Sequence, residues 1–155
     1  MQTITLVERE GAELDIVRSL FREYEEELNE DLCFQSFEAE LRDPLTKYVQ
    51  SGGAIVLAYV DDEPAGCIAL LPHSQSDCEM KRLFVRPAYR KSGLGRELVQ
   101  LLLDLASEKG FTVMKLDTLN KLQPAIKLYE QFGFIHINAY YNNPLPGVVY
   151  MEKEL

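Results

Sequence analysis

The fold is decided by one segment, Leu83-Phe84-Val85-Arg86-Pro87-Ala88-Tyr89-Arg90-Lys91-Ser92-Gly93-Leu94-Gly95-Arg96. Its first residues are β-branched or aromatic and favour an extended strand. Leucines then recur at helical spacing, at positions 94, 98, 101, 102 and 105. The segment therefore predicts a strand that ends near Val85, a basic turn, and a helix that begins at the glycines and runs to about residue 109.

The basic turn has the properties of an anion-binding site. The first amide groups of a helix have no intrahelical partner and lie at the positive end of its dipole, so a phosphate finds donors there. Gly93 and Gly95 let a phosphate approach the backbone, and Arg90, Lys91 and Arg96 add positive charge in a chain whose net charge is −9. The alternative is an ordinary surface loop, because glycine and arginine are common where helices start.

Two widespread phosphate motifs do not fit this turn. Leu98 stands where the dinucleotide fingerprint needs its third glycine, and the chain has no Gly-Lys-Ser or Gly-Lys-Thr run of a Walker loop. The remaining pattern, Arg-x-x-Gly-x-Gly, resembles the pyrophosphate loop of the GNAT superfamily of acetyl-CoA-dependent N-acyltransferases. Arg90, Gly93 and Gly95 carry this resemblance.

Length and composition set the limits within which such an enzyme must fit. The 155 residues are 46% hydrophobic, so we expect one domain, residues 1–155, that buries its own core. Three cysteines at positions 33, 67 and 78 lack paired spacing, so neither a disulfide framework nor a metal site is expected, and a reducing cytoplasm fits. The first residues resemble no signal sequence, and no apolar run has membrane-spanning length. The 25 acidic against 16 basic residues argue against a nucleic-acid partner.

The predicted elements follow an order that the superfamily shares. They are a strand at 2–7, helices at 14–28 and around Phe34, Phe37 and Leu41, strands at 54–60, 64–71 and 78–85, a helix at 94–109, a strand at 111–117, a helix at 125–132, and extended segments at 134–137 and 148–152. The resemblance implies an α/β (α+β) fold, the GNAT acyl-CoA N-acyltransferase fold. Its central sheet is mixed, mostly antiparallel, has about seven strands and is flanked by about four helices.

A second signature supports the resemblance. The segment Ala125-Ile126-Lys127-Leu128-Tyr129-Glu130-Gln131-Phe132-Gly133-Phe134 resembles the Ala-x-x-Leu-Tyr-x-x-x-Gly-Phe pattern of the superfamily. The family often places a cofactor-binding Asn seven residues before the tyrosine, where this chain has Leu122. Asn120 is the candidate substitute for that contact. The start of the helix has two candidates, Asn120 as an N-cap and Pro124 as a residue of the first turn.

The resemblance implies attack of an amine on the thioester of acetyl-CoA, with roles for several residues. The amides of Leu83 and Val85 would bind the acetyl carbonyl and the pantetheine arm where two central strands splay apart. Tyr129 stands at the position of the acid that protonates the departing thiolate, although by itself it also fits a core aromatic. Glu79 lies eleven residues before Arg90, the offset of the catalytic glutamate in the histone-acetylating branch of the family.

Strand alternation predicts that residues 79, 81, 83 and 85 share one side, so that Glu79 would face the cofactor cleft as a general base. The alternative for Glu79 is a polar residue that starts a strand or pairs with Lys81 or Arg82. These two cations would repel an ammonium but could hold a carboxylate, which favours a small amino acid or another acidic amine as acceptor. The segment 140–147 could wall the acceptor pocket, but a simple loop is the preferred interpretation.

Three functions stay open at this point. The first is acetylation of a small-molecule amine, the second is acetylation of a protein lysine or N-terminus, and the third is a non-catalytic acyl-CoA-binding module. Homodimers are common in the family, so a homodimer is one expected assembly, although the sequence identifies no interface.

Overall fold

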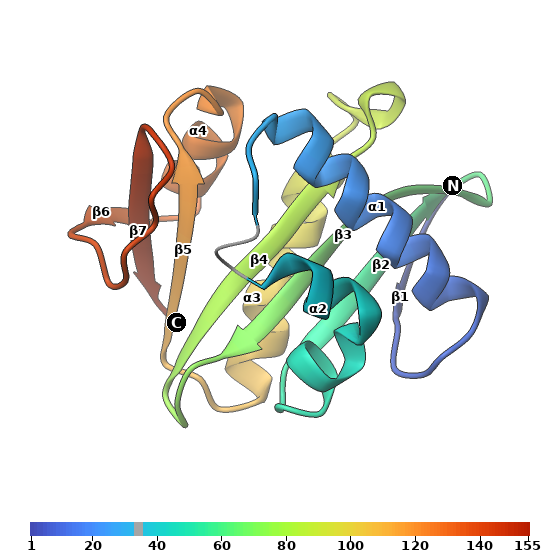
Figure 1. Ribbon diagram of the computed structural model, residues 1–155, viewed down its shortest axis with the longest axis horizontal. Coiled ribbons are helices and arrows are strands. Elements are labelled where there is room, and N and C mark those ends of the chain that lie inside the picture. Colours follow the sequence, from blue (N-terminus) through green and yellow to red (C-terminus); the bar gives the residue numbers. More distant parts are fainter. Residues whose placement is uncertain (33–35) are drawn as a thin grey trace.

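The computed structural model describes residues 1–32 and 36–155 and contains one seven-stranded sheet with helices on both faces (Figure 1). The expectations for Cys33 and Phe34 fall outside the described residues. The sheet order is β1-β2-β3-β4-β5-β7-β6, and every neighbouring pair is antiparallel except β4–β5. This confirms the mixed, mostly antiparallel sheet. The strands are β1 (Gln2–Leu6), β2 (Ala54–Val60), β3 (Glu63–Pro72), β4 (Asp77–Val85), β5 (Val113–Leu119), β6 (Ile135–Ile137) and β7 (Val148–Glu154).

The helices divide between the two faces of the sheet. Helices α1 (Ala12–Leu28) and α2 (Phe37–Arg42) cover one face, and α3 (Leu94–Glu108) covers the other. Helix α4 (Gln123–Gln131) follows β5, and two short helical turns, the π-helical η2 (Leu45–Val49) and the 3₁₀-helical η3 (Pro87–Tyr89), complete the described helical segments. The sequence did not predict these two turns, which are too short to show a periodic pattern. No helix in the described part of the chain is long and apolar enough to cross a membrane.

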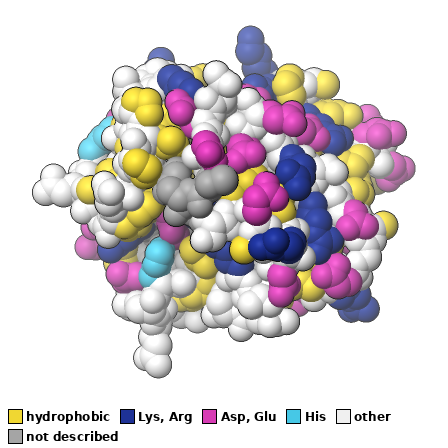
Figure 2. All heavy atoms as spheres, viewed as in Figure 1, with side chains coloured by type: hydrophobic (Ala, Val, Ile, Leu, Met, Phe, Trp, Pro, Cys, Tyr) yellow, Lys and Arg dark blue, Asp and Glu magenta, His cyan; other side chains and the backbone are white. Residues whose placement is uncertain are grey.

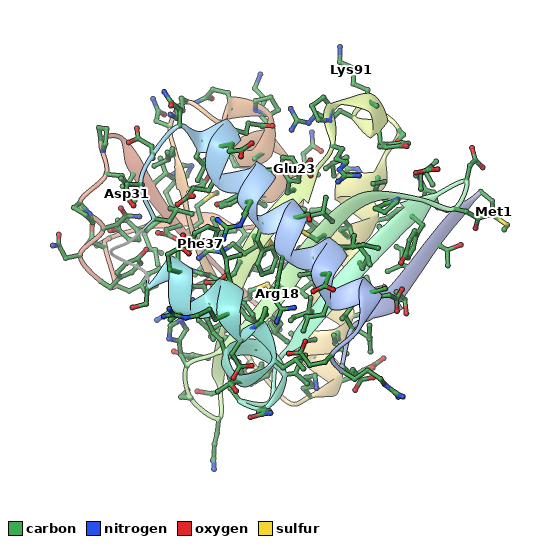
Figure 3. The ribbon with its side chains drawn as sticks, turned by 45° about the vertical axis from the view of Figure 1, so that its right-hand side comes forward. Met1, Arg18, Glu23, Asp31, Phe37 and Lys91 are labelled. Atoms are coloured by element: carbon green, nitrogen blue, oxygen red, sulfur yellow. The ribbon has the colours of Figure 1, made fainter. Side chains whose placement is uncertain are left out.

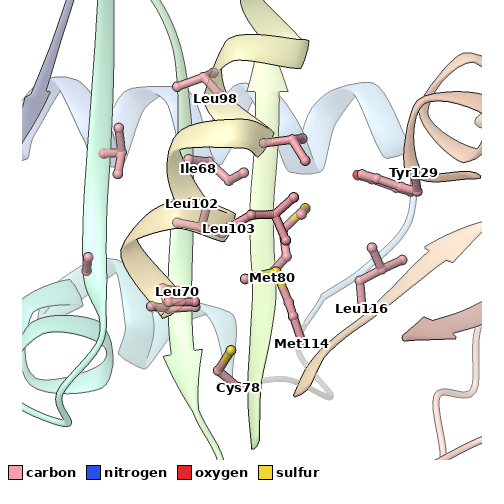
Figure 4. Packing of buried hydrophobic residues seen from close by; sticks show 14 of the residues in the cluster. Ile68, Leu70, Cys78, Met80, Leu98, Leu102, Leu103, Met114, Leu116 and Tyr129 are labelled. Carbon is pink, nitrogen blue, oxygen red and sulfur yellow. The ribbon is translucent and has the colours of Figure 1, made fainter. Parts of the chain in front are cut away.

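Each face of the sheet has its own hydrophobic core. On the α3 side, Leu98 and Leu102 pack over Ile68 of β3 and Met80 of β4, while Tyr129 points in from α4 (Figure 4). Full burial of one such side chain stabilises the fold by roughly 1.5–3 kcal/mol. The opposite core is built from the apolar stripe of α1 and from α2. The helical periodicity of the sequence therefore identified the buried face of α1 and part of that of α3, where Leu101 and Leu105 are only partly buried.

Strands β4 and β5 pair only at their beginnings. Their parallel ladder consists of Asp77↔Val113, Cys78↔Met114 and Glu79↔Lys115. The two strands continue to Val85 and Leu119, but these later residues form no further β4–β5 pair in the described structure. The sheet is therefore open between the second halves of its two central strands.

Strand β4 also contains a bulge that the sequence did not predict. Ala69 pairs with Lys81 and Cys67 pairs with Phe84, so one extra residue of β4 lies opposite β3, and Arg82 adopts a left-handed φ of 62°. Phe84 consequently joins the core under α1, whereas residues 83 and 85 pack on the α3 side with Met80. The expected single face for residues 79, 81, 83 and 85 is thus wrong, because the bulge reverses the alternation after residue 81.

Candidate active site

The turn between η3 and α3 has the open geometry of an anion cradle. Gly93 has φ 88°, precedes the first residue of α3, and accepts the backbone hydrogen bond of Glu97 at 3.1 Å. A side-chain carbon added at Gly93 would meet no heavy atom within 4 Å, and one added at Gly95 would lie 3.8 Å from Leu128. A ligand can therefore reach the backbone at the start of α3 without displacing protein atoms.

The basic side chains of the turn have different surroundings. The Arg90 Nε donates to the carbonyl of Val85 at 2.8 Å, and its guanidinium also pairs with Glu27 of α1. Arg96 pairs with Gln131 of α4 and lies over the ring of Phe132. Arg90 therefore ties the turn to β4 and α1, whereas Arg96 ties α3 to α4.

Lys91 and Ser92 complete the turn. Lys91 has a left-handed φ of 67° and projects away from the body of the protein (Figure 3). The Ser92 hydroxyl donates to the carbonyl of Tyr89 at 2.6 Å. Ser92 thus stabilises the turn itself, while the Lys91 side chain extends into the solvent beside the cradle.

An apolar groove leads from this turn toward the open part of the sheet. It runs between α1, the end of β4 and α4, and its lining includes Leu28, Phe84, Val85, Leu122 and Leu128. Leu122 thus occupies the groove at the position where the family often carries its cofactor-binding Asn. An apolar side chain there can pack against a ligand but cannot donate a hydrogen bond to it.

Asn120 lies on the exposed connection before α4. Its backbone nitrogen donates to the carbonyl of Gly147 at 2.7 Å, and its side-chain oxygen accepts from Gln123 at 3.1 Å. Helix α4 begins at Gln123 and has Pro124 in its first turn, so the proline, and not Asn120, marks the start of the helix. Direct cofactor binding by Asn120 remains a prediction.

The groove continues into a central cavity where β4 and β5 separate. Tyr24, Leu28, Leu83, Leu122 and Ala125 line both spaces. The polar lining of the cavity comes from α1, β4, β5, α4 and the loop before β7, and consists of Tyr24, Lys81, Arg82, Asp117, Thr118, Tyr129 and Asn143. The loop of residues 140–147, for which the sequence favoured a plain connection, therefore also walls the cavity.

Tyr129 reaches the cavity from α4 and is 6% exposed. Its ring contacts that of Phe134 with a centroid distance of 5.9 Å. Burial raises the pKa of Tyr129, and the nearby Tyr24 and Asp117 act in the same direction. The phenol therefore remains protonated at neutral pH, as a proton donor must.

Glu79 lies deeper in the sheet, at the last β4–β5 pair, and is 2% exposed. Its Oε1 accepts a hydrogen bond from His73 Nε2 at 2.7 Å, and its Oε2 accepts one from the Tyr140 hydroxyl at 2.8 Å. Lys81 Nζ is 3.7 Å from the same Oε2. Burial acts to raise the pKa of Glu79, but the bond from His73, the charge of Lys81 and the bond from Tyr140 outweigh it and leave the pKa lowered. The described residues that line the central cavity do not include Glu79.

The two cations next to Glu79 differ in their availability to a substrate. The Arg82 guanidinium donates two hydrogen bonds to Glu40 of α2, at 2.9 and 2.8 Å, and both residues are buried. Lys81 is 8% exposed, and burial together with the charge of Arg82 lowers its pKa. Both residues line the central cavity, but the contact of Lys81 with Glu79 is longer, at 3.7 Å, than the two bonds that hold Arg82, so Lys81 is the candidate for a substrate carboxylate.

Sequence reasoning missed two acidic residues of this region. Glu40 is separated from Arg82 by 42 positions, and its side chain is also bound by Lys47 Nζ at 2.6 Å. Asp117, near the end of β5, accepts hydrogen bonds from the Tyr141 hydroxyl and from Asn143 Nδ2, the latter at 2.7 Å. A polar residue late in a central strand is a weak signal for Asp117, whereas no local pattern marks Glu40.

Comparison with known proteins now identifies the family. The model of the acetyltransferase (GNAT) family matches residues 14–134, which include the cradle, the groove and Tyr129. The chain belongs to the GNAT family of N-acetyltransferases.

Relatives of this GNAT protein match nearly its whole length. It is 41% identical over 145 residues to an uncharacterized N-acetyltransferase of Schizosaccharomyces pombe, covering 92% of this chain and 89% of that protein. An acetyltransferase from Streptococcus agalactiae has the same fold, with a TM-score of 0.83, 24% identity and coverage of 99% and 98% of the two chains. A GNAT acetyltransferase from Elizabethkingia anophelis, solved with acetyl-CoA bound, superimposes with a TM-score of 0.69 at 20% identity over 99% and 98% of the chains.

Proposed function

We propose that this GNAT protein transfers the acetyl group of acetyl-CoA to the primary amine of a small-molecule acceptor, by direct attack in a ternary complex. The main support for this proposal is the path that leads from the Gly93 turn along the apolar groove to the cavity lined by Tyr129. Acetyl-CoA has the matching parts in the same order, since an anionic pyrophosphate precedes a largely extended arm and a thioester. A GNAT structure with acetyl-CoA bound supports this choice of acyl donor.

The residues of the turn would hold the phosphates. The backbone from Lys91 to Gly95 offers amides at the positive end of α3, and Arg90 stands beside it as a cation. Leu83 and Val85 line the groove in the part of β4 that no longer pairs with β5, so their amides are the candidates for the acetyl carbonyl and the pantetheine arm.

Two proton transfers accompany the reaction. The departing sulfur takes a proton from the Tyr129 phenol, whose burial keeps it neutral until then. The acceptor ammonium must lose a proton before it can attack, because a primary amine has a pKa near roughly 10.4. The offset of Glu79 from Arg90, which resembles that of the histone-acetylating branch, makes Glu79 one candidate to receive this proton, directly or through water.

The shape and charge of the cavity favour a compact acceptor. Leu32 and Leu145 contribute to its walls from the connection after α1 and from the loop before β7. Lys81 provides a cation that can bind a carboxylate of the acceptor, which points to an amino acid or another acidic amine.

The proposal can be tested without knowing the acceptor. Calorimetric titration should show binding of acetyl-CoA that coenzyme A and ADP compete for, and a panel of small amines should then reveal amine-dependent release of free thiol. Acetylation of peptides but not of small amines would favour a protein-modifying enzyme. Tight binding without turnover on either panel would favour an acyl-CoA-binding module, and absence of binding by folded protein would overturn the proposal.

A further inference from the structure

We propose that Asp117 is the catalytic carboxylate that receives the proton of the acceptor ammonium, a role that rests on the acetyl transfer proposed above. Asp117 lies on β5 and lines the central cavity together with Tyr129 and Leu83. A group that accepts a proton during the reaction must lie within reach of the reacting nitrogen. The cavity thus places Asp117 beside the candidate acid and the candidate carbonyl-binding strand.

The topology of the sheet separates Asp117 from Glu79. Glu79 belongs to the last β4–β5 pair, Glu79↔Lys115, so its side chain emerges where the two strands are still joined. Asp117 is two residues beyond Lys115 and therefore faces the same side, but in the part of β5 that has left β4. An acceptor that enters the gap between the strands meets Asp117 before it could reach Glu79.

Hydrogen bonds fix the orientation of the Asp117 carboxylate. The Tyr141 hydroxyl and Asn143 Nδ2 both bind Oδ2, and the Tyr150 hydroxyl in turn donates to the carbonyl of Tyr141 at 2.8 Å. Within the described part of the chain, both hydrogen bonds to Asp117 are therefore accepted by Oδ2. This arrangement leaves Oδ1 to face a substrate. The charge of Asp117 also acts within the cavity, where it adds to the effect of burial in raising the pKa values of Tyr24 and Tyr129.

Glu79 has the opposite arrangement. Each of its carboxylate oxygens accepts a hydrogen bond, from His73 and from Tyr140, and its pKa lies below the ordinary value. Among the described residues, both oxygens of Glu79 are therefore already bound, whereas the donors to Asp117 both bind Oδ2 and leave Oδ1 facing the cavity side. Glu79 is therefore better suited to anchor Tyr140, and with it the loop that carries Tyr141 and Asn143, than to remove the substrate proton.

The proton and electron balance of the step is complete with groups that the structure holds. The ammonium gives one proton to Asp117 Oδ1, and the freed lone pair forms the C–N bond with the acetyl carbon. The C–S bond breaks, its electron pair stays on sulfur, and the Tyr129 phenol protonates that sulfur. The second proton of the nitrogen restores the phenol, and Asp117 releases its proton to solvent.

The test compares Asp117→Asn with Glu79→Gln on two acceptors of similar shape. One is a strongly basic amine, and the other is a weakly basic amine that is mostly neutral at the assay pH. Loss of the proton acceptor should reduce kcat/KM for the basic amine by roughly 10²- to 10⁴-fold and for the weakly basic amine by less than about tenfold. Glu79→Gln should reduce both values to a similar, smaller extent.

Binding gives a readout that is independent of turnover. Calorimetric affinity of Asp117→Asn for acetyl-CoA should stay within about threefold of the wild type, whereas its affinity for the basic amine should fall by about tenfold or more, the effect of a lost hydrogen bond to a charged group. If Asp117→Asn does not fold, Asp117→Ser serves instead, because its hydroxyl still accepts a bond from Asn143 but is not a base.

Two results would overturn the assignment. One is an equal loss for both amines in the Asp117 variants, and the other is an amine-dependent loss that appears only in Glu79→Gln. Both require turnover by the wild type, so they overturn the role of Asp117 alone. Failure of the wild type to acetylate any amine would instead overturn the proposed function, and the role of Asp117 with it.

Discussion

Arg82 and Glu40 form a buried ion pair that joins the bulge of β4 to α2. The guanidinium donates from Nε and from a terminal nitrogen to both carboxylate oxygens, and each residue is 3% exposed. Arg82 is also the residue whose left-handed φ reverses the alternation of β4. The pair therefore stabilises the backbone geometry that turns the side chains of residues 83 and 85 toward the α3 side of the sheet.

Removal of the Glu40 charge should destabilise the protein strongly. Glu40→Gln leaves the Arg82 guanidinium buried without a counterion, so we expect the free energy of unfolding to fall by about 3–5 kcal/mol. Urea denaturation measures this loss. The matched control is Glu38→Gln on the same helix, because Glu38 forms an exposed pair with Arg22 at 3.7 Å and loss of such a pair should cost less than about 1 kcal/mol. Equal, small losses in both variants would show that the pair is dispensable.

Stability should also depend on pH through Glu40. Burial acts to raise the pKa of Glu40, but the bonds and charges of Arg82 and Lys47 lower it from 4.5 to about 2. Since the folded-state pKa is depressed, this stabilisation is present above pH 4.5 and is lost as the pH falls toward 2. The shift corresponds to about 3 kcal/mol. Urea midpoints between these pH values should decline more steeply in the wild type than in Glu40→Gln, and parallel declines would refute the assignment.

Glu27 should compete with the cofactor for Arg90. Its carboxylate pairs with the Arg90 guanidinium at the edge of the cradle, so Glu27→Gln frees a cation for the pyrophosphate. We expect acetyl-CoA affinity to rise by about two- to fivefold, the worth of one exposed ion pair. Glu26→Gln removes the same charge from the neighbouring exposed position and controls for long-range electrostatics. The same gain in both variants would mean that Arg90 is not the group released.

Gly93→Arg should abolish acetyl-CoA binding by filling the cradle. The side chain meets open space but occupies the place of the phosphates, and the left-handed backbone adds about 1 kcal/mol of strain. Gly110→Arg is the control, because Gly110 has φ 94°, equally open surroundings and a position after the other end of α3. Both variants should lose similar stability, but Gly110→Arg should retain binding. Intact calorimetric binding in Gly93→Arg would show that the cradle is misplaced.

The surface charges of the protein determine how far the effect of a single charge change extends. The face that carries α1 and α2 shows acidic and basic side chains interspersed (Figure 2). Because charges more than about 10 Å apart are screened at moderate salt, the effects of Glu27 and Arg90 should be local. They should shrink as the salt concentration rises.

The sequence predicted the elements whose signals are local. Leucine periodicity identified α3, Gly93 and Gly95 marked its start, and hydrophobic patterns with turn residues between them predicted the order of the strands. The bulge could not be predicted, because an extra residue in β4 is defined only by its pairing with β3. The expected shared face of residues 79, 81, 83 and 85 was consequently wrong for residues 83 and 85.

The roles of Asp117 and Glu40 depend on contacts between distant segments. Asp117 gains its orientation from Tyr141 and Asn143, which follow it by 24 and 26 positions. Glu40 lies on a six-residue helix whose pattern is too short to reveal an inward-facing charge. Such residues become visible only when the chain is folded.

The most direct test of the account is thiol release by Tyr129→Phe. Amine-dependent release of coenzyme A by the wild type should fall by about 100-fold or more in the variant, because the departing sulfur loses its acid. Acetyl-CoA affinity should change by less than about threefold, since the phenyl ring keeps the contact with Phe134. Undiminished turnover in Tyr129→Phe, or a wild type that releases no thiol with any amine, would contradict the account.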